Sequence, residues 1–126
     1  MQQKLICRHS DWELYELAFE TSMDIFARTQ AFPGEEKGTL TDPLRLASRS
    51  LCATLAHAWR TRFDDRLFRL KLNEAETLAA EIQTWLEFAQ RCGYLEAATT
   101  KLLIQRYRKI LGKVVWLMPV APTIDR

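Results

Sequence analysis

The chain has 126 residues, of which 48% are hydrophobic and 27% are charged, so its size and composition are those of one globular domain rather than of a disordered or fibrous protein. Its four glycines and four prolines are too few for a sheet protein with frequent turns, so they favour long helices. The net charge of +2 is too small by itself to indicate a nucleic-acid-binding protein.

The first predicted helix covers residues 11–31, where apolar side chains recur at helical spacing in two parallel stripes. One stripe contains Trp12, Tyr15, Phe19, Met23 and Phe26, and the other contains Leu14, Ala18 and Ile25. A helix with so wide an apolar arc needs more than one neighbour to cover it. Ser10 or Asp11 is the expected cap, because both side chains can accept a hydrogen bond from a free backbone N–H.

The second predicted helix covers residues 42–61 and follows a loop at 32–38, where a proline and two glycines interrupt the first helix. Thr41 or Asp42 is the expected cap, and Pro43 fits the first turn because its missing N–H costs nothing there. Its expected buried stripe contains Leu44, Ala47, Leu51, Leu55, Ala58 and Trp59.

The third predicted helix covers residues 64–92, with Asp64 as its cap, and at about 1.5 Å per residue it would be roughly 40 Å long. Its buried stripe is expected to contain Phe68, Leu72, Ala75, Ala79, Ile82, Leu86 and Ala89. Gly93 stands where a glycine commonly ends a helix in the left-handed conformation. We expect this helix to be the spine of the fold.

The fourth predicted helix covers residues 95–118, and prolines then leave an extended tail at 119–126. Its apolar repeat contains Leu103, Tyr107, Ile110, Val114 and Leu117. Short connections force consecutive helices to run antiparallel. The sequence therefore predicts one all-α domain over residues 1–126, an up-down-up-down antiparallel four-helix bundle.

Catalytic and metal-binding patterns are not found in the sequence. Cys7, Cys52 and Cys92 form no C-x-x-C pair, and His57 has no carboxylate at a helical neighbour position to orient it. We therefore expect no enzyme, metal, cofactor or small-molecule substrate. No signal peptide or membrane span is predicted, so the cytoplasm is the expected location and a membrane is not an expected partner.

Charge is the most informative feature, because the first helix is acidic while the second and fourth are basic. One explanation is neutralisation within the bundle, with Asp11, Glu13 and Glu16 near Arg60 and Arg62. The other is an external anion, because cations at the start of the third helix oppose its dipole and cations on the fourth repel each other. That anion would be either an acidic face of another subunit or the phosphates of RNA or DNA.

The candidate nucleic-acid-binding residues are ten cationic side chains of the last three helices, which we expect to form one basic face. They are Arg45, Arg49, Arg60, Arg62, Arg66, Arg69, Arg106, Arg108, Lys109 and Lys113. Two further hypotheses concern other parts of the chain. The first assigns four aromatic side chains to the core rather than to a base-stacking site: Trp59, Trp85, Tyr94 and Trp116. The second is that the tail at 119–126 either docks on a neighbouring subunit or is disordered.

Several segments resemble one known family at matching intervals. They are Phe32-Pro33-Gly34-Glu35-Glu36-Lys37, then Leu40-Thr41-x-x-Leu44-Arg45-x-Ala47-x-x-Ser50-Leu51, then Glu81-Ile82-x-Thr84 and Gly93-Tyr94-Leu95. The chain resembles the four-helix-bundle proteins encoded in intervening sequences of 23S ribosomal RNA genes, whose relatives include the accessory variability protein of diversity-generating retroelements. The resemblance covers residues 11–118. It implies a homopentameric ring without enzymatic activity and a role in binding nucleic acid or a nucleic-acid enzyme.

One signature of that family is missing. Where the family has Ser-Ile-Pro-x-Asn-Ile-Ala-Glu-Gly, this chain reads Ser50-Leu51-Cys52-Ala53-Thr54-Leu55-Ala56-His57-Ala58. The proline, asparagine, glutamate and glycine of the signature are all replaced, and a small Gly-Ser pair of the family's third helix is replaced by Thr77 and Leu78. The departure leaves the predicted fold intact and weakens the inference of the family's function for this chain.

Overall fold

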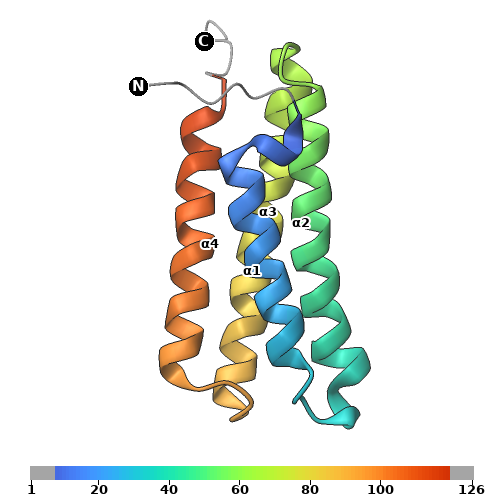
Figure 1. Ribbon diagram of the computed structural model, residues 1–126, viewed down its shortest axis with the longest axis vertical. Coiled ribbons are helices and arrows are strands. Elements are labelled where there is room, and N and C mark those ends of the chain that lie inside the picture. Colours follow the sequence, from blue (N-terminus) through green and yellow to red (C-terminus); the bar gives the residue numbers. More distant parts are fainter. Residues whose placement is uncertain (1–7, 120–126) are drawn as a thin grey trace, which may run out of the picture.

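Four antiparallel helices form an up-down-up-down bundle in the computed structural model, which describes residues 8–119 (Figure 1). The helices are α1 (Glu13–Thr29), α2 (Asp42–Arg60), α3 (Asp65–Arg91) and α4 (Ala97–Leu117). Short helical turns precede α1 and α2: His9–Asp11, Gly34–Glu36 and the π-helical turn Lys37–Thr41. Residues 8–119 contain no strand, so the predicted all-α bundle is confirmed.

The order of the helices around the bundle places α2 between α1 and α3, while α4 packs against α3 and α1. The α2–α3 turn therefore lies at one end of the bundle, and the α1–α2 and α3–α4 connections lie at the other (Figure 1). The predicted seam of α3 is buried at six of its seven positions, and Phe68 is half-buried at the margin of the core. The spine predicted from the sequence thus supplies one wall of the core.

The wide apolar arc of α1 is only partly covered within this chain. Leu14, Ala18 and Ile25 are buried, as their stripe predicts. In the other stripe Phe19 and Met23 stay 48% and 53% exposed, because α2 and α4 pack against the first stripe and reach only the edge of the second. Two neighbouring helices thus leave part of the arc uncovered within residues 8–119.

Two predicted helix caps differ from the structure, although α2 begins at Asp42 as expected. The first helix begins at Glu13 and not at residue 11, because His9–Asp11 forms a separate 3₁₀ turn and Trp12 takes the cap position without a side-chain hydrogen bond. Thr41 makes no capping hydrogen bond either, because the π-helical turn runs directly into α2 and its backbone is already helical. The cap at Asp64 is confirmed, since its Oδ1 accepts from the Leu67 N–H at 3.1 Å.

The two connections at one end of the bundle are tied together by Tyr94. Its hydroxyl donates to Glu36 Oε2 at 2.8 Å, and its ring packs on Phe32 with centroids 5.6 Å apart. Gly93, at φ 84°, provides the left-handed turn that brings Tyr94 back toward the α1–α2 connection. This contact fixes the common level at which α1 and α3 end.

Candidate functional site

The ten candidate cations do not lie on one face of the bundle. Arg60, Arg62, Arg66 and Arg69 lie at the end formed by the α2–α3 turn, and Arg45 and Arg49 lie between α1 and α2 near the other end. The other four, Arg106, Arg108, Lys109 and Lys113, are spread around α4. The structure therefore divides the predicted site into separate groups with different surroundings.

At the α2–α3 turn, Arg62 is held between two aromatic rings. Its guanidinium carbon lies 3.8 Å from the ring centre of Trp59 and 4.4 Å from that of Phe63, and its Nη1 donates to the Trp59 carbonyl at 2.7 Å. Arg60 and Arg66 are exposed on either side of this turn. We call Arg60, Arg62 and Arg66 the arginine end. Phe63 beside it is 87% exposed.

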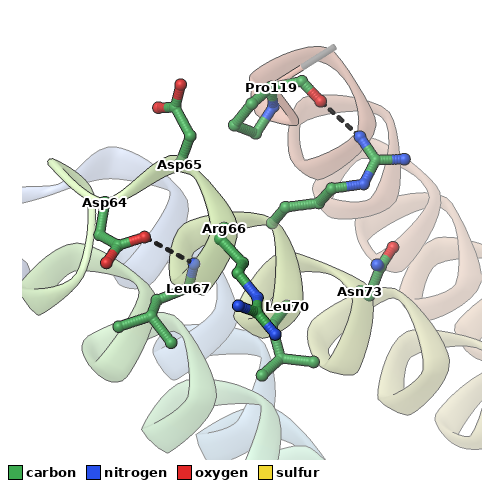
Figure 2. Close-up of a pocket in the computed structure, with 8 residues that line it drawn as sticks. Asp64, Asp65, Arg66, Leu67, Leu70, Asn73 and Pro119 are labelled. Carbon is green, nitrogen blue, oxygen red and sulfur yellow. Dashed lines mark hydrogen bonds between the residues drawn. The ribbon is translucent and has the colours of Figure 1, made fainter. Parts of the chain in front are cut away.

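A hollow of about 750 Å³ opens next to the arginine end, between the first turns of α3 and Pro119 (Figure 2). Arg69 crosses it and donates to the carbonyl oxygen of Pro119, so this cation links α3 to the end of α4. Asp64 and Asp65 also line the hollow, and Asp64 is engaged in capping α3. The hollow carries both charge signs, and Arg69 acts there as a structural link. The rest of the predicted tail, 120–126, lies outside the described residues.

Between α1 and α2, two cations share one aromatic ring. The guanidinium carbons of Arg45 and Arg49 lie 4.7 Å and 5.5 Å from the ring centre of Phe26. Arg45 Nε also donates to Thr29 Oγ1 at 2.7 Å, which fixes its direction. A hollow of about 230 Å³ beside Arg49 is lined mainly by apolar groups, including Phe19 and Met23. We call this surface, composed of Phe19, Met23, Phe26, Arg45 and Arg49, the α1–α2 socket.

The cations of α4 point to different neighbours. Arg106 Nη1 contacts Asp24 Oδ2 of α1 at 2.9 Å, and the same carboxylate accepts from Arg28 Nε at 2.9 Å. Arg108 instead lines a shallow surface depression with Gln90 of α3. Lys109 and Lys113 are exposed. Arg106 is thus neutralised inside the bundle, and the other three candidate cations of α4 are not paired with a carboxylate within residues 8–119.

Neutralisation between the acidic start of α1 and Arg60 or Arg62 is not what the described contacts show. Asp11 pairs with Arg8 at 3.8 Å, and Arg62 is engaged with Trp59 and Phe63. Within residues 8–119, the ion pair that joins two of the four long helices is Asp24–Arg106, between α1 and α4.

Two further features were missed at the sequence level. Phe26 was assigned to an apolar stripe, and Phe63 was given no role because it falls at an uncertain helix boundary. The sequence gives no signal for Phe63, because it stands four residues after Trp59 and so continues the apolar spacing of the second helix. For Phe26 no signal exists without knowing that α2 packs against that side of α1.

Chemistry at Cys52 is disfavoured by its position. Burial raises the pKa of the Cys52 thiol to about 11, so it stays protonated and is a poor nucleophile. Among residues 8–119 no cluster of three or more histidine, cysteine, aspartate or glutamate side chains is arranged to hold a metal ion. In the same part of the chain no helix combines the length and apolarity needed to cross a bilayer.

Residues 10–115 match the family model of the 23S rRNA-intervening sequence protein. This chain belongs to that family. No curated protein and no solved structure gives a significant match. The 23S rRNA-intervening sequence proteins are small helical proteins that are not known as enzymes.

The family segments found in the sequence have a structural explanation here. Phe32 and Glu36 of the first segment contact Tyr94 of the last one, so the two segments form the tie that closes one end of the bundle. The departing stretch 50–58 lies on α2, where Leu51, Leu55 and Ala58 are buried in the core. In this 23S rRNA-intervening sequence protein the stretch that replaces the signature therefore still supplies buried side chains to the core.

Proposed function

We propose that this 23S rRNA-intervening sequence protein is a non-enzymatic, self-associating bundle, a homopentamer, that binds the phosphates of RNA or DNA through the arginine end. One observation carries the nucleic-acid part. Nine of the ten candidate cations, all except Arg106, make no ion pair with a carboxylate within residues 8–119. Charges that the fold does not neutralise are available to an external anion.

The arginine end is the group best placed to meet such an anion. Arg62 is oriented by two rings and a carbonyl group, so little side-chain freedom is lost when it binds a phosphate. Arg60 and Arg66 are exposed beside it. Arginine suits this role because its planar fork can donate two hydrogen bonds to one phosphate.

Self-association is supported by the uncovered stripe of α1. Phe19 and Met23 are about half exposed and lie next to an apolar hollow, which another subunit would cover. The number of five subunits comes from the family resemblance. The alternative function is a purely structural or protein-interaction module, in which the basic helices pair with the acidic first helix of a neighbouring subunit.

Filter binding of labelled RNA and DNA over a range of salt tests the proposal. We expect retention at low salt that weakens steeply with salt. The double variant Arg60→Gln with Arg66→Gln should reduce the salt slope by about 2, one for each lost phosphate contact. The control is Lys37→Gln with Lys101→Gln, which removes the same charge at the opposite end of the bundle and should leave the slope unchanged.

The outcomes separate the two functions when light scattering is run over the same salt range. Absence of retention at low salt contradicts nucleic-acid binding. Dissociation of the oligomer by salt, without retention of either nucleic acid, supports the alternative, because ion pairs between exposed groups are screened by salt.

A further inference from the structure

The α1–α2 socket brings together two cations and no anion. Arg45 and Arg49 both contact the Phe26 ring, and neither pairs with a carboxylate within residues 8–119. They stand one helical turn apart on α2, where like charges repel. The hydrogen bond to Thr29 holds the Arg45 side chain in place, so Arg45 does not move away from Arg49 to relieve this repulsion. The socket is therefore preorganised for a negatively charged partner.

The surface beside these cations is apolar, and this restricts the chemical class of the negatively charged partner. The hollow of about 230 Å³ next to Arg49 is bordered by Phe19, Met23 and Phe26. A phosphate or a free acid would leave these side chains in water. The partner that fits must carry a large apolar side chain directly beside its carboxylate.

A segment of α3 in this same chain has that composition. Phe88 is 54% exposed and faces solvent, because Ile82, Leu86 and Ala89 of the same helix face the core. Glu87 precedes it and is exposed, and the two side chains border a shallow depression together with Arg91. We call Glu87 and Phe88 the α3 knob.

The socket and the knob lie at the same level along the bundle. Phe32 and Tyr94 pack together and mark a common level at the end of α1 and α3. Phe26 stands three residues before the end of α1 at Thr29, and Phe88 stands three residues before the end of α3 at Arg91. At about 1.5 Å per residue both lie roughly 4.5 Å from the ends of their helices.

The two surfaces are also on different sides of the bundle. The socket belongs to α1 and α2, while the knob belongs to the solvent-exposed side of α3. In the bundle α3 lies diagonally across from α1, with α2 and α4 on the two sides (Figure 1). Unlike surfaces at one level can meet by a rotation about an axis along the bundle, which is the contact that closes a ring. Glu13, at the opposite end of α1, could not reach Arg45 in such a ring.

We propose that the α3 knob of one copy of this chain docks into the α1–α2 socket of the next. Phe88 covers the hollow beside Phe26, and the Glu87 carboxylate lies between the guanidinium groups of Arg45 and Arg49. The inference rests on the proposed self-association and gives it a location. It also removes these two arginines from the nucleic-acid-binding set.

Charge reversal tests this contact by light scattering on the full chain. Arg49→Glu and Glu87→Arg should each reduce the mass about five-fold from that of a pentamer, to the 14.7 kDa of one chain. The double variant should restore the oligomer in part, because the exchanged charges at positions 49 and 87 again attract each other while Arg45 keeps its charge. Both positions are exposed, so the folded bundle is kept and circular dichroism verifies it. The control is Glu13→Arg, which makes the same charge change at the other end and should leave the mass unchanged.

The results distinguish this inference from the function on which it rests. A monomeric wild-type protein contradicts self-association itself. An oligomeric wild type whose two single variants stay oligomeric, or are not rescued by the double variant, overturns the knob-and-socket contact and leaves self-association standing.

Discussion

Tyr94 and Glu36 form the contact at residue scale whose strength depends most on pH. The hydrogen bonds from Thr39 and Tyr94 lower the pKa of Glu36 below its ordinary value of 4.5. The same bond, with burial second, raises the pKa of Tyr94 to about 12. The bond thus needs a carboxylate on one side and a neutral phenol on the other.

Replacing Tyr94 by phenylalanine should lower the melting temperature slightly near neutral pH, because the ring contact with Phe32 remains while the hydrogen bond is lost. Because the pKa of Glu36 is lowered, its hydrogen bonds stabilise the fold above pH 4.5, and this stabilisation is lost as the pH falls. Because the pKa of Tyr94 is raised, its hydrogen bond stabilises the fold below pH 10, and this stabilisation is lost as the pH rises toward 12. The difference between the wild type and Tyr94→Phe should therefore shrink at both extremes, as measured by circular dichroism melts. A difference that is constant with pH contradicts this assignment.

Tyr107 is a second residue with a specific expectation. It is fully buried, and its hydroxyl has no hydrogen-bond partner within residues 8–119, so burial raises its pKa. Tyr107→Phe removes an unsatisfied polar group and should leave the free energy of unfolding unchanged or raise it by about 1 kcal/mol. Tyr107→Ala should lower it by about 3–5 kcal/mol through the cavity left behind. Urea unfolding measures both, and a large loss in Tyr107→Phe would mean that the hydroxyl has a partner.

At the scale of the element, the start of α3 depends on Asp64. Its side chain accepts the Leu67 N–H, whereas Asp65 is the first residue of the helix and makes no such cap. Asp64→Ala should lower the free energy of unfolding by about 1 kcal/mol. Asp65→Ala removes the same charge at the same helix end and should cost less, about 0.3–1 kcal/mol from the helix dipole. Equal losses in urea unfolding would show that charge and not capping matters at Asp64.

The sequence was sufficient for the elements themselves because their signals are local. Apolar spacing located the four helices. Asp64 marked the start of α3 and Gly93 marked its end, and both of these assignments are confirmed. The caps predicted for α1 and α2 were wrong because a turn before each helix, which depends on packing, takes the place of a side-chain cap. The turn before α1 also moves the start of that helix to Glu13, whereas α2 starts at Asp42 as expected.

The candidate site was less predictable because it depends on which helices are neighbours. Spacing identifies Arg106 and Arg108 as helix positions, but only the order of helices shows that the first meets Asp24 of α1 and the second faces α3. Arg62 is similar, since the geometry of the α2–α3 turn places it between Trp59 and Phe63. Grouping all ten cations on one face therefore exceeded what periodicity determines.

At the scale of the whole molecule, the bundle presents two surfaces that its own chain does not complete. Within residues 8–119, the arginine end carries cations that pair with no carboxylate, and the α1–α2 socket carries cations beside partly exposed apolar side chains. They lie near opposite ends of the bundle, so a ring formed through the socket leaves the arginine end of every copy on one rim (Figure 1). Repetition of that end around a ring would strengthen binding to a long phosphate chain.

Sedimentation velocity of a labelled single-stranded RNA with the protein, at low and at moderate salt, tests this account most directly. At low salt the label should move with the mass of the protein oligomer, and at moderate salt it should return toward the rate of free RNA. The Arg60→Gln and Arg66→Gln variant should release it at a lower salt concentration than the Lys37→Gln and Lys101→Gln control. RNA that sediments at its free rate at low salt, beside an intact oligomer, would contradict nucleic-acid binding by the arginine end.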